Sequence, residues 1–268
     1  MYVLNGLSYN VQVTGRGPAL LLLHGFTGDL HTWDPFVPAW SQKFRVIAVD
    51  LPGHGRTGAP RDPERYRLER CAADLVRLLD ELGADDVRVL GYSMGGRVAL
   101  HLALAAPQRV TALVLESASP GIRDPAERAA RRQADEELAT FIEREGVASF
   151  VERWERLPLF ATQARLPEGV RSAVRAQRLR QRAEGLANAL RGMGAGVQEP
   201  LHGRLGEIQA PALLLAGALD EKYVGIVQEM AAVMPRARAV IVPDAGHAVH
   251  LERPDAFMQA VTEFLTGL

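Results

Sequence analysis

The chain has 268 residues, of which 47% are hydrophobic, and its formal net charge is −1. This length and composition suffice for one large α/β core, alone or with a cap. A charge so close to zero excludes the overall basic field that draws a protein to nucleic acid or to an anionic membrane. We therefore expect neither as a partner.

The amino-terminal residues and the single cysteine bear on the location of the protein. Residues 1–13 lack the basic and apolar regions of a secretory signal, and no apolar stretch reaches the length of a membrane span. Cys71 cannot form an internal disulfide, and its helical context predicts a small packed side chain. We expect a cytoplasmic protein, and a monomer.

Short apolar runs alternate with helical patterns along the chain. Residues 7–13 alternate in the manner of an edge strand. Runs rich in Val, Leu and Ile, typical of strands buried on both faces of a parallel sheet, occur at 19–23, 45–49, 87–90, 112–115, 212–216 and 239–242. Helical patterns cover 68–82, 96–106, 224–234 and 254–265. The alternation predicts an α/β fold with a mostly parallel, doubly wound sheet.

The alternation is interrupted between residues 119 and 205, where helical patterns continue without a strand and arginine is frequent. An insertion here, after the sixth strand, predicts a helical cap over the carboxyl ends of the strands, where open α/β sheets bind ligands. We therefore expect a core formed by residues 1–118 and 206–268, and a cap formed by residues 119–205.

The pentapeptide Gly91-Tyr92-Ser93-Met94-Gly95 joins a strand pattern to an apolar helical pattern. Gly-x-Ser-x-Gly in this place is a nucleophile elbow. The turn is so tight that side chains two positions before and after the serine would collide, which accounts for Gly91 and Gly95. The Ser93 hydroxyl is thereby held out of the sheet at a helix N-terminus, where the helix dipole favours negative charge.

A serine hydroxyl is too weakly acidic to react unaided, so it needs a base and a group that orients the base. In elbow folds the chain order is serine, acid, histidine. Asp220 and His247 each follow a predicted strand, on the same edge of the sheet as Ser93. These three residues form the predicted catalytic triad. His250 remains an alternative base, and Asp244 and Glu221 remain alternatives to Asp220.

Negative charge that develops on a substrate oxygen needs hydrogen-bond donors already in place. The backbone N–H of Met94, directly after the serine, is the first predicted donor of this oxyanion hole. The second is the N–H of Phe26, in the loop after the strand pattern 19–23, where Gly25 permits a close approach. The turn at residues 50–55 is expected to shape the fold and to carry no chemistry.

Arg97 lies one helical turn after Ser93. A long side chain there leans back toward the helix N-terminus and reaches the expected pocket. A guanidinium beside the nucleophile suits a carboxylate-bearing substrate better than an apolar ester. A solvated or salt-bridged helix position remains the alternative for Arg97.

Several of these strings together resemble a known family. The α/β-hydrolase superfamily as a whole is indicated by residues 22–28, Trp33, residues 50–55 and the elbow. A more specific resemblance appears when these strings are combined with Pro120-Gly121 and residues 127–131, 217–222 and 245–250. The chain then resembles the 2-succinyl-6-hydroxy-2,4-cyclohexadiene-1-carboxylate synthases, which are lyases of menaquinone biosynthesis, over nearly its whole length. The resemblance implies an α/β-hydrolase fold and the elimination of pyruvate from a substrate with three carboxylates, without a metal or an organic cofactor.

The resemblance also implies site residues, carried over position by position. Ser93, Asp220 and His247 match the triad, and Phe26 and Met94 match the oxyanion hole. Substrate-contacting positions are matched by Tyr92, Arg97, Arg131, Trp154 and Arg178. Three of these stay open: Arg132 could replace Arg131, Arg175 or Arg180 could replace Arg178, and Trp154 could simply pack between helices.

Two other functions remain in competition. One is a serine hydrolase of small esters or of carbon–carbon bonds in ring-cleavage products, with Ser93 as covalent nucleophile. The other is a ligand receptor that keeps the fold without turnover. A dehalogenase is disfavoured because its elbow nucleophile is usually aspartate.

Overall fold

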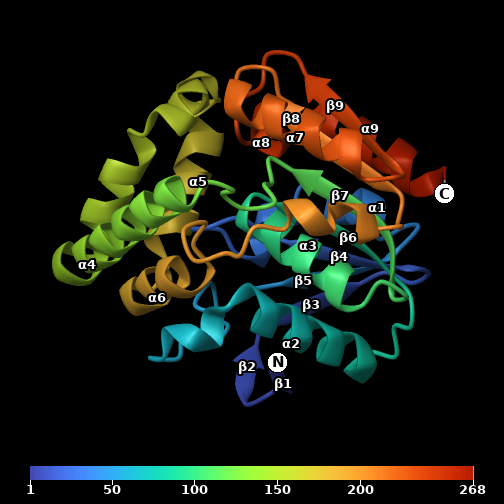
Figure 1. Cartoon of the computed structure of the whole chain (residues 1–268), viewed down its shortest axis with the longest axis horizontal. Helices are drawn as coiled ribbons and strands as arrows, with labels where there is room; N and C mark the ends of the chain where they lie inside the picture. Colours follow the sequence, from blue (N-terminus) through green and yellow to red (C-terminus); the bar gives the residue numbers. More distant parts are fainter. Residues whose placement is uncertain (268) are drawn as a thin grey trace.

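The computed structural model of the protein describes residues 1–267. Seven strands form its main sheet: β3 (Val11–Thr14), β4 (Ala19–Leu23), β5 (Arg45–Val49), β6 (Val87–Tyr92), β7 (Val110–Glu116), β8 (Ala212–Gly217) and β9 (Ala237–Val242). Their order in the sheet is β3-β5-β4-β6-β7-β8-β9 (Figure 1). Edge strand β3 is antiparallel to β5, and every other pair of neighbours is parallel.

The segment 7–13, expected as one edge strand, contributes to two sheets. Its first part, β2 (Leu7–Tyr9), pairs with β1 (Tyr2–Leu4) in a separate hairpin, and its second part belongs to β3. The interruption falls at Asn10, whose amide side chain donates to Asp50 and whose backbone N–H donates to Thr57. These bonds to the turn at residues 50–58 replace a continuous strand.

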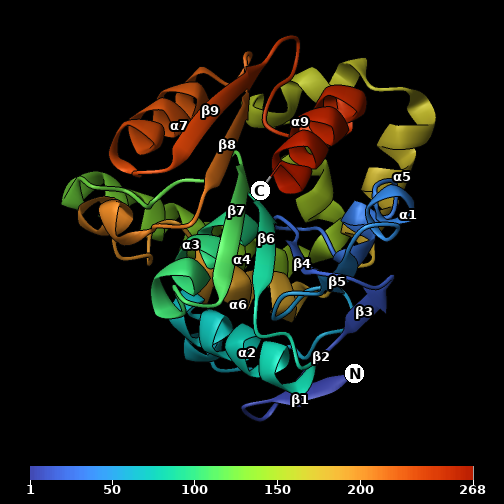
Figure 2. The same ribbon diagram turned by 90° about the vertical axis from the view of Figure 1, so that its right-hand side faces the viewer.

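Helices cover both faces of the main sheet, so the predicted doubly wound arrangement is confirmed. One face packs against α2 (Leu68–Glu81), α3 (Met94–Ala105) and α7 (Glu221–Val233). The other packs against the short helices η1 (Leu30–Trp33) and α1 (Val37–Trp40) and the carboxyl-terminal α9 (Pro254–Thr266). Figure 2 shows the two layers on opposite sides of the strands. Cys71 of α2 is buried in the first layer, as expected.

The segment between β7 and β8 contains helices joined by loops, and no strand. It contains α4 (Pro125–Glu155), η3 (Pro158–Arg165), α5 (Glu168–Leu179) and α6 (Ala183–Met193), which lie together beside the carboxyl ends of the strands (Figure 1). Gly146, at φ 80°, divides α4 into two helical parts. A small apolar cluster that includes Ile142, Phe150 and Leu186 holds α4 against α6.

The helical insertion follows β7, the seventh strand of the chain and the fifth of the main sheet, rather than the sixth. Its place in the sequence is the expected one. The domain limits 119–205 stay a prediction. The remaining short helices are η2 (Pro63–Tyr66), η4 (His202–Glu207) and α8 (Val249–Glu252).

The connections of the sheet reverse direction between β4 and β6. After β4 the chain adds β5 on one side, and then returns to add β6 on the other side. Reversal points of this kind leave a crevice at the carboxyl ends of the strands. The last residue of β4, Leu23, pairs with Gly91 of β6, so the loops that follow these two strands begin side by side. Among residues 1–267, no helix is both long and apolar enough to cross a membrane.

Candidate active site

Ser93 connects β6 to α3 in a strained conformation. Its φ of 50° and ψ of −106° lie outside the regions that most residues adopt. A Cβ on Gly91 would lie 2.6 Å from the backbone nitrogen of Gly96, and a Cβ on Gly95 would lie 2.6 Å from the carbonyl oxygen of His24. The sharp turn therefore requires glycine at both positions, for the steric reason that the sequence suggested.

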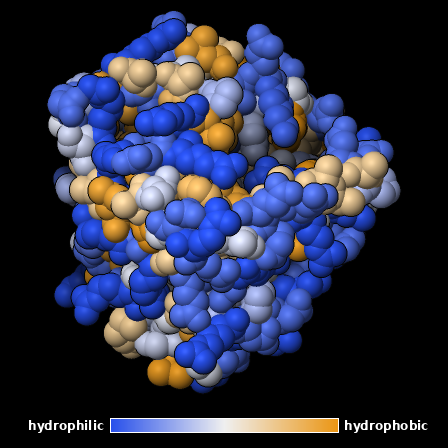
Figure 3. Space-filling view, turned by 90° about the vertical axis from the view of Figure 1, so that its left-hand side faces the viewer, coloured by the Kyte–Doolittle hydropathy of each residue, from blue (hydrophilic) through white to orange (hydrophobic). Residues whose placement is uncertain are grey.

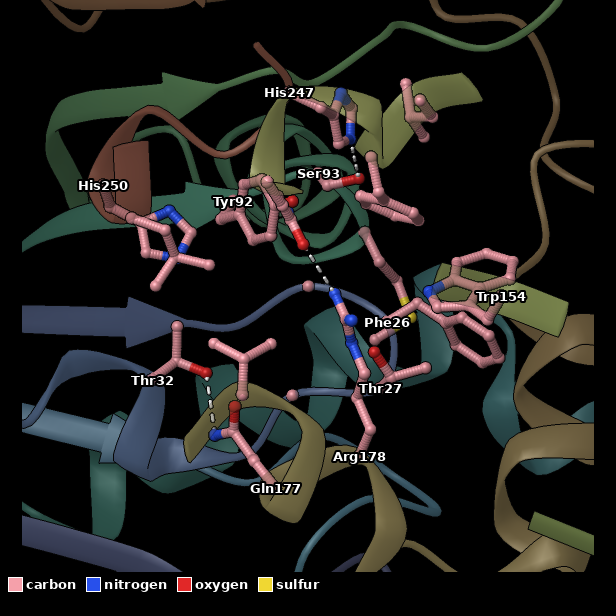
Figure 4. A pocket seen from close by; sticks show the side chains of 18 of the residues that line it. Phe26, Thr27, Thr32, Tyr92, Ser93, Trp154, Gln177, Arg178, His247 and His250 are labelled. Atoms are coloured by element: carbon pink, nitrogen blue, oxygen red, sulfur yellow. Dashed lines mark hydrogen bonds between the residues drawn. The ribbon is translucent and has the colours of Figure 1, made fainter. Parts of the chain in front are cut away.

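The structure brings Ser93, His247 and Asp220 into one hydrogen-bonded chain. The hydroxyl of Ser93 lies 3.1 Å from Nε2 of His247 (Figure 4). Nδ1 of His247 lies 2.7 Å from Oδ2 of Asp220. The second carboxylate oxygen of Asp220 accepts from the backbone N–H of Tyr223 and caps α7. Strands β8 and β9 are paired up to their last residues, and this pairing sets the two loops beside each other.

The three alternatives for the base and the acid lie elsewhere. His250 faces Glu116 rather than Ser93: its Nδ1 is 2.9 Å from both carboxylate oxygens of Glu116. Asp244 is exposed and pairs with Arg253. Glu221 is exposed at the start of α7. The geometry thus favours His247 and Asp220 over each alternative.

The backbone N–H groups of Phe26 and Met94 both lie beside the elbow. Neither donates a hydrogen bond to another group within residues 1–267. Gly25 permits the close approach of this loop, because a Cβ there would lie 2.6 Å from the ring of Tyr92. His24 fixes the loop from beneath, since its Nε2 accepts from the N–H of Leu51 and its Nδ1 donates to the Gly25 carbonyl.

A cavity of about 580 Å³ lies between the strand ends and the helical insertion, and Ser93 and His247 form part of its wall. The residues expected to contact a substrate all line this cavity: Phe26, Tyr92, Met94, Arg97, Arg131, Trp154 and Arg178. Figure 4 shows Ser93 and His247 on one side of this space, with Trp154 and Arg178 reaching in from the cap. The site thus combines core and cap residues.

Arg97 has an unusual environment for a partly buried cation. One guanidinium nitrogen, Nη1, donates to the backbone carbonyl of Met193 at 2.6 Å and to the side-chain oxygen of Gln198 at 3.4 Å, yet no carboxylate within residues 1–267 lies within 4.0 Å. Its other nitrogens remain open to the cavity. Burial lowers the pKa of Arg97 to about 10, so the side chain is still charged at neutral pH. A partly buried cation of this kind lacks a counter-ion.

Arg131 and Arg178 are held by carboxylates of the cap. Nε of Arg131 donates to Asp135 at 2.8 Å. Arg178 is buried, donates to Glu155 at 3.1 Å and to Gln163 at 3.1 Å, and lies over the ring of Phe160. Of the residues that could have replaced Arg131 or Arg178, Arg132 and Arg175 do not line the cavity, whereas Arg180 lines its exposed rim.

Tyr92 and Trp154 supply aromatic surface on opposite walls. The Tyr92 ring lies between His247 and His250, with centroid distances of 5.6 and 4.7 Å. Burial raises the pKa of Tyr92 well above its usual value, so its hydroxyl stays protonated and can donate. Trp154 meets Phe26 edge to face at 5.3 Å. Trp154 therefore both packs against neighbouring rings and faces the cavity.

Several polar residues of the cavity were not predicted from the sequence, among them Tyr223 and Gln177. Tyr223 packs edge to face on the His247 ring at 4.6 Å, and Gln177 of the cap donates to Thr32 at 3.2 Å (Figure 4). The position of Tyr223, three residues after Asp220 at a helix start, was a usable signal. No sequence signal pointed to Gln177, because its helix carries polar residues on most sides. Within residues 1–267, no cluster of three or more metal-ligating side chains occurs.

Residues 18–254 match the family described as alpha/beta hydrolase fold. A Bacillus subtilis (strain 168) protein provisionally named 2-succinyl-6-hydroxy-2,4-cyclohexadiene-1-carboxylate synthase is 44% identical, over 99% of this chain and 97% of its own length. The synthase of that name from Salmonella typhimurium is 32% identical, over 92% of this chain and 94% of its own. The structure of MenH from S. aureus has a TM-score of 0.92 at 36% identity, covering 97% of this chain and 98% of that one.

Proposed function

Because the chain belongs to the α/β-hydrolase superfamily, and within it to the 2-succinyl-6-hydroxy-2,4-cyclohexadiene-1-carboxylate synthase family of enzymes, we propose that it eliminates pyruvate from 2-succinyl-5-enolpyruvyl-6-hydroxy-3-cyclohexene-1-carboxylate. The product is 2-succinyl-6-hydroxy-2,4-cyclohexadiene-1-carboxylate. The substrate carries three carboxylates, one on its ring and one on each of its succinyl and enolpyruvyl substituents. The cavity that would receive it is lined by four arginines: Arg97, Arg131, Arg178 and, at its exposed rim, Arg180.

The proposed reaction begins with proton removal. Ser93 passes its hydroxyl proton to Nε2 of His247 while its oxygen takes the proton on ring carbon C2, next to the succinyl ketone. The ketone becomes an enolate, whose oxygen accepts from the N–H groups of Phe26 and Met94. Asp220 orients the His247 ring and stabilises the imidazolium that forms. No acyl-enzyme and no hydrolytic water take part.

The enolate then expels the leaving group. Its electrons form the C2=C3 double bond, the ring double bond moves from C3=C4 to C4=C5, and the bond from C5 to the enolpyruvyl oxygen breaks. The enolate of pyruvate leaves and takes the proton from Nε2 of His247, which balances the proton that Ser93 removed from C2. This order of events returns Ser93 and His247 to their starting states.

One observation carries the proposal: the charged guanidinium of Arg97 opens into the cavity beside Ser93 without a carboxylate partner among the described residues. A buried cation is costly unless it is paired. A substrate carboxylate would supply that missing partner, and a simple apolar ester would not. The hydrogen-bonded chain from Ser93 to Asp220 alone suits ester hydrolysis equally well.

The test compares two reactions of the purified protein. The cyclohexene substrate is supplied while diene absorbance and pyruvate release are followed, and nitrophenyl esters are assayed beside it. The proposal predicts many turnovers of the cyclohexene substrate and slow ester hydrolysis. Fast ester hydrolysis with an inert cyclohexene substrate would instead establish a serine hydrolase. Saturable binding without turnover would establish a receptor.

A further inference from the structure

A second histidine–carboxylate pair lies beside the first. His250, at the start of α8, and Glu116, the last residue of β7, have side chains that are 1% and 0% exposed. Glu116 accepts from Nδ1 of His250 with both oxygens, and it also accepts from the backbone N–H of the same residue at 3.0 Å. The proposed elimination uses neither residue.

The ring of His250 is fixed from several sides. Trp33, Tyr92 and Phe257 surround it, with centroid distances of 5.4, 4.7 and 6.0 Å. His250 nevertheless lines the same cavity as Ser93. Figure 4 shows it next to Tyr92, on the side away from Trp154.

The two ring nitrogens of His250 differ in their surroundings. The Glu116 carboxylate, an acceptor, fixes a proton on Nδ1. Nε2 has no hydrogen-bond partner within residues 1–267, and it is not among the polar atoms that the described residues enclose. A purely structural pair gains nothing from an open ring nitrogen, whereas a ligand can use one. This orientation repeats that of His247, whose Nδ1 faces Asp220 and whose Nε2 faces Ser93.

Nε2 of His250 adds a hydrogen-bond acceptor to a cavity whose arginines and oxyanion-hole N–H groups are donors. Arg97, Arg131 and Arg178 can only donate, as can the N–H groups of Phe26 and Met94. Such donors suit carboxylates and an enolate oxygen. A hydroxyl on the ligand must instead give its proton to an acceptor, and the lone pair on Nε2 of the neutral imidazole is one.

From this geometry we propose that His250 is a further substrate-binding residue, whose Nε2 accepts a hydrogen bond from a hydroxyl on the ligand. The inference rests on the proposed function, in which the substrate carries a ring hydroxyl at C6. In this assignment Glu116 is a positioning residue, because it acts on the ligand only through the His250 ring. The pair would thus distinguish hydroxylated rings from rings without the hydroxyl.

The test measures binding without reaction, in a Ser93→Ala background, by calorimetry. Two ligands are compared: the cyclohexene substrate and its analogue without the C6 hydroxyl. We expect His250→Phe to weaken binding of the substrate about 3- to 10-fold, the range of one hydrogen bond, and to leave binding of the analogue unchanged. Loss of the hydroxyl should weaken binding to the Ser93→Ala protein by the same factor.

Two further variants guard against effects on folding. His250→Phe leaves Glu116 buried without its partner, so the double variant Glu116→Leu/His250→Phe, which removes both polar groups, is measured as well and should behave in the same way. His101→Gln is the matched control, because His101 is a buried histidine 3.6 Å from Glu69 and does not line the cavity. It should bind both ligands like the Ser93→Ala protein.

The results separate the two proposals. Equal weakening of both ligands by His250→Phe, or no weakening of either, would overturn the role of His250 and leave the proposed function intact. If the Ser93→Ala protein itself bound neither ligand, the proposed function would fail, and the assignment of His250 would fail with it.

Discussion

Ser93 has a backbone conformation that costs about 1–3 kcal/mol, and the surrounding elbow holds it there. Alanine in its place would keep that backbone and lose only the hydroxyl. We therefore expect Ser93→Ala to lower kcat on the cyclohexene substrate at least 1000-fold, roughly the scale seen when a triad member is removed. The melting temperature should change by only a few degrees.

Ser172→Ala is the control for this variant, because Ser172 is exposed on α5 and its hydroxyl donates to Glu168. It should keep full activity. Turnover by Ser93→Ala at more than a tenth of the normal rate would show that the hydroxyl is not the base.

Arg97 is expected to act mainly on substrate affinity. Removing its charge by Arg97→Ala should raise KM roughly 10- to 100-fold, the range of a charge-assisted hydrogen bond, with a smaller effect on kcat. The KM of Arg97→Lys should lie between those of the unchanged protein and of Arg97→Ala, because lysine keeps the charge and loses the planar donor pair. Steady-state kinetics of pyruvate release measure both constants.

Arg132→Ala is the matched control for Arg97, since Arg132 is exposed and does not line the cavity. It should leave KM unchanged. If Arg97→Ala and Arg132→Ala had equal kinetics, the assignment of Arg97 to a substrate carboxylate would be wrong.

At the scale of single elements, every parallel strand of the main sheet was predicted in its place, whereas β1 was not predicted and residues 7–13 were expected as one strand. Two helix starts were placed too late. The helical patterns begin at 96 and 224, whereas α3 begins at Met94 and α7 at Glu221. In both cases a candidate site residue is the cap: Ser93 precedes α3, and Asp220 accepts from a backbone N–H of α7. At α7 the polar residues Glu221 and Lys222 precede the apolar periodicity, and at α3 the first residues belong to the elbow pentapeptide, so the helical pattern alone begins too late.

The elbow tests how strictly one element depends on glycine. A Cβ on Gly95 would press on the carbonyl groups at the end of β4, which cannot move without disturbing the sheet. We expect Gly95→Ala to lower the free energy of unfolding by about 3 kcal/mol, as overpacking does. Urea denaturation measures this change.

Gly225 provides the contrast, because it lies within α7 and a Cβ there would have no neighbouring atom within 4 Å. Gly225→Ala should raise the free energy of unfolding by about 0.5–1 kcal/mol, since alanine favours helix. Equal effects of the two substitutions would contradict the steric account of the elbow.

The turn at residues 50–55 gives the core a sensitivity to acid. Burial lowers the pKa of His54 to about 3, and it also lowers the pKa of His24. In the unfolded chain a histidine has a pKa near 6.5. The unfolded state therefore binds more protons between about pH 6.5 and pH 3, so stability is complete above this window and is lost as the pH falls through it.

We expect His54→Asn, whose amide can replace the bond from Nδ1 to the Pro52 carbonyl, to reduce this loss. Replacing one such histidine should reduce the slope of the free energy of unfolding against pH by at most about 1.4 kcal/mol per pH unit. Urea denaturation from pH 7 to pH 4 measures both proteins. If the free energy of unfolding fell equally with pH in His54→Asn and in the unchanged protein, His54 would not contribute to the acid sensitivity.

At the scale of the whole molecule, the cap and the core meet through apolar contacts, such as that of Trp154 with Phe26, and through polar ones. Gln177 and Gln181 of the cap donate to the loop after β4, at Thr32 and at the Gly28 carbonyl. Arg182 donates to the carbonyl of Thr57. Figure 3 shows a largely hydrophilic exterior on this side, with apolar side chains in separate groups. These contacts hold the cap over Ser93, and they explain how residues far apart in sequence come to share one cavity.

The sequence predicted the layers of the fold and the meeting of Ser93, Asp220 and His247, because strand order and strand ends follow from local patterns. It did not predict the partner of His250, since Glu116 lies 134 residues away and appears in the sequence as part of an apolar strand. Nor did it distinguish Arg131 from Arg132, because one residue of helix rotation decides which faces the cavity.

The central claim is that Ser93, assisted by His247, removes the proton on C2 and that pyruvate leaves as a result. The most direct measurement uses the cyclohexene substrate with deuterium at C2, with the diene and pyruvate quantified together. The account predicts one pyruvate for each diene and slower turnover than with hydrogen at C2, because the C2–D bond must break. Equal turnover of the two isotopic substrates, or pyruvate release without formation of the diene, would contradict it.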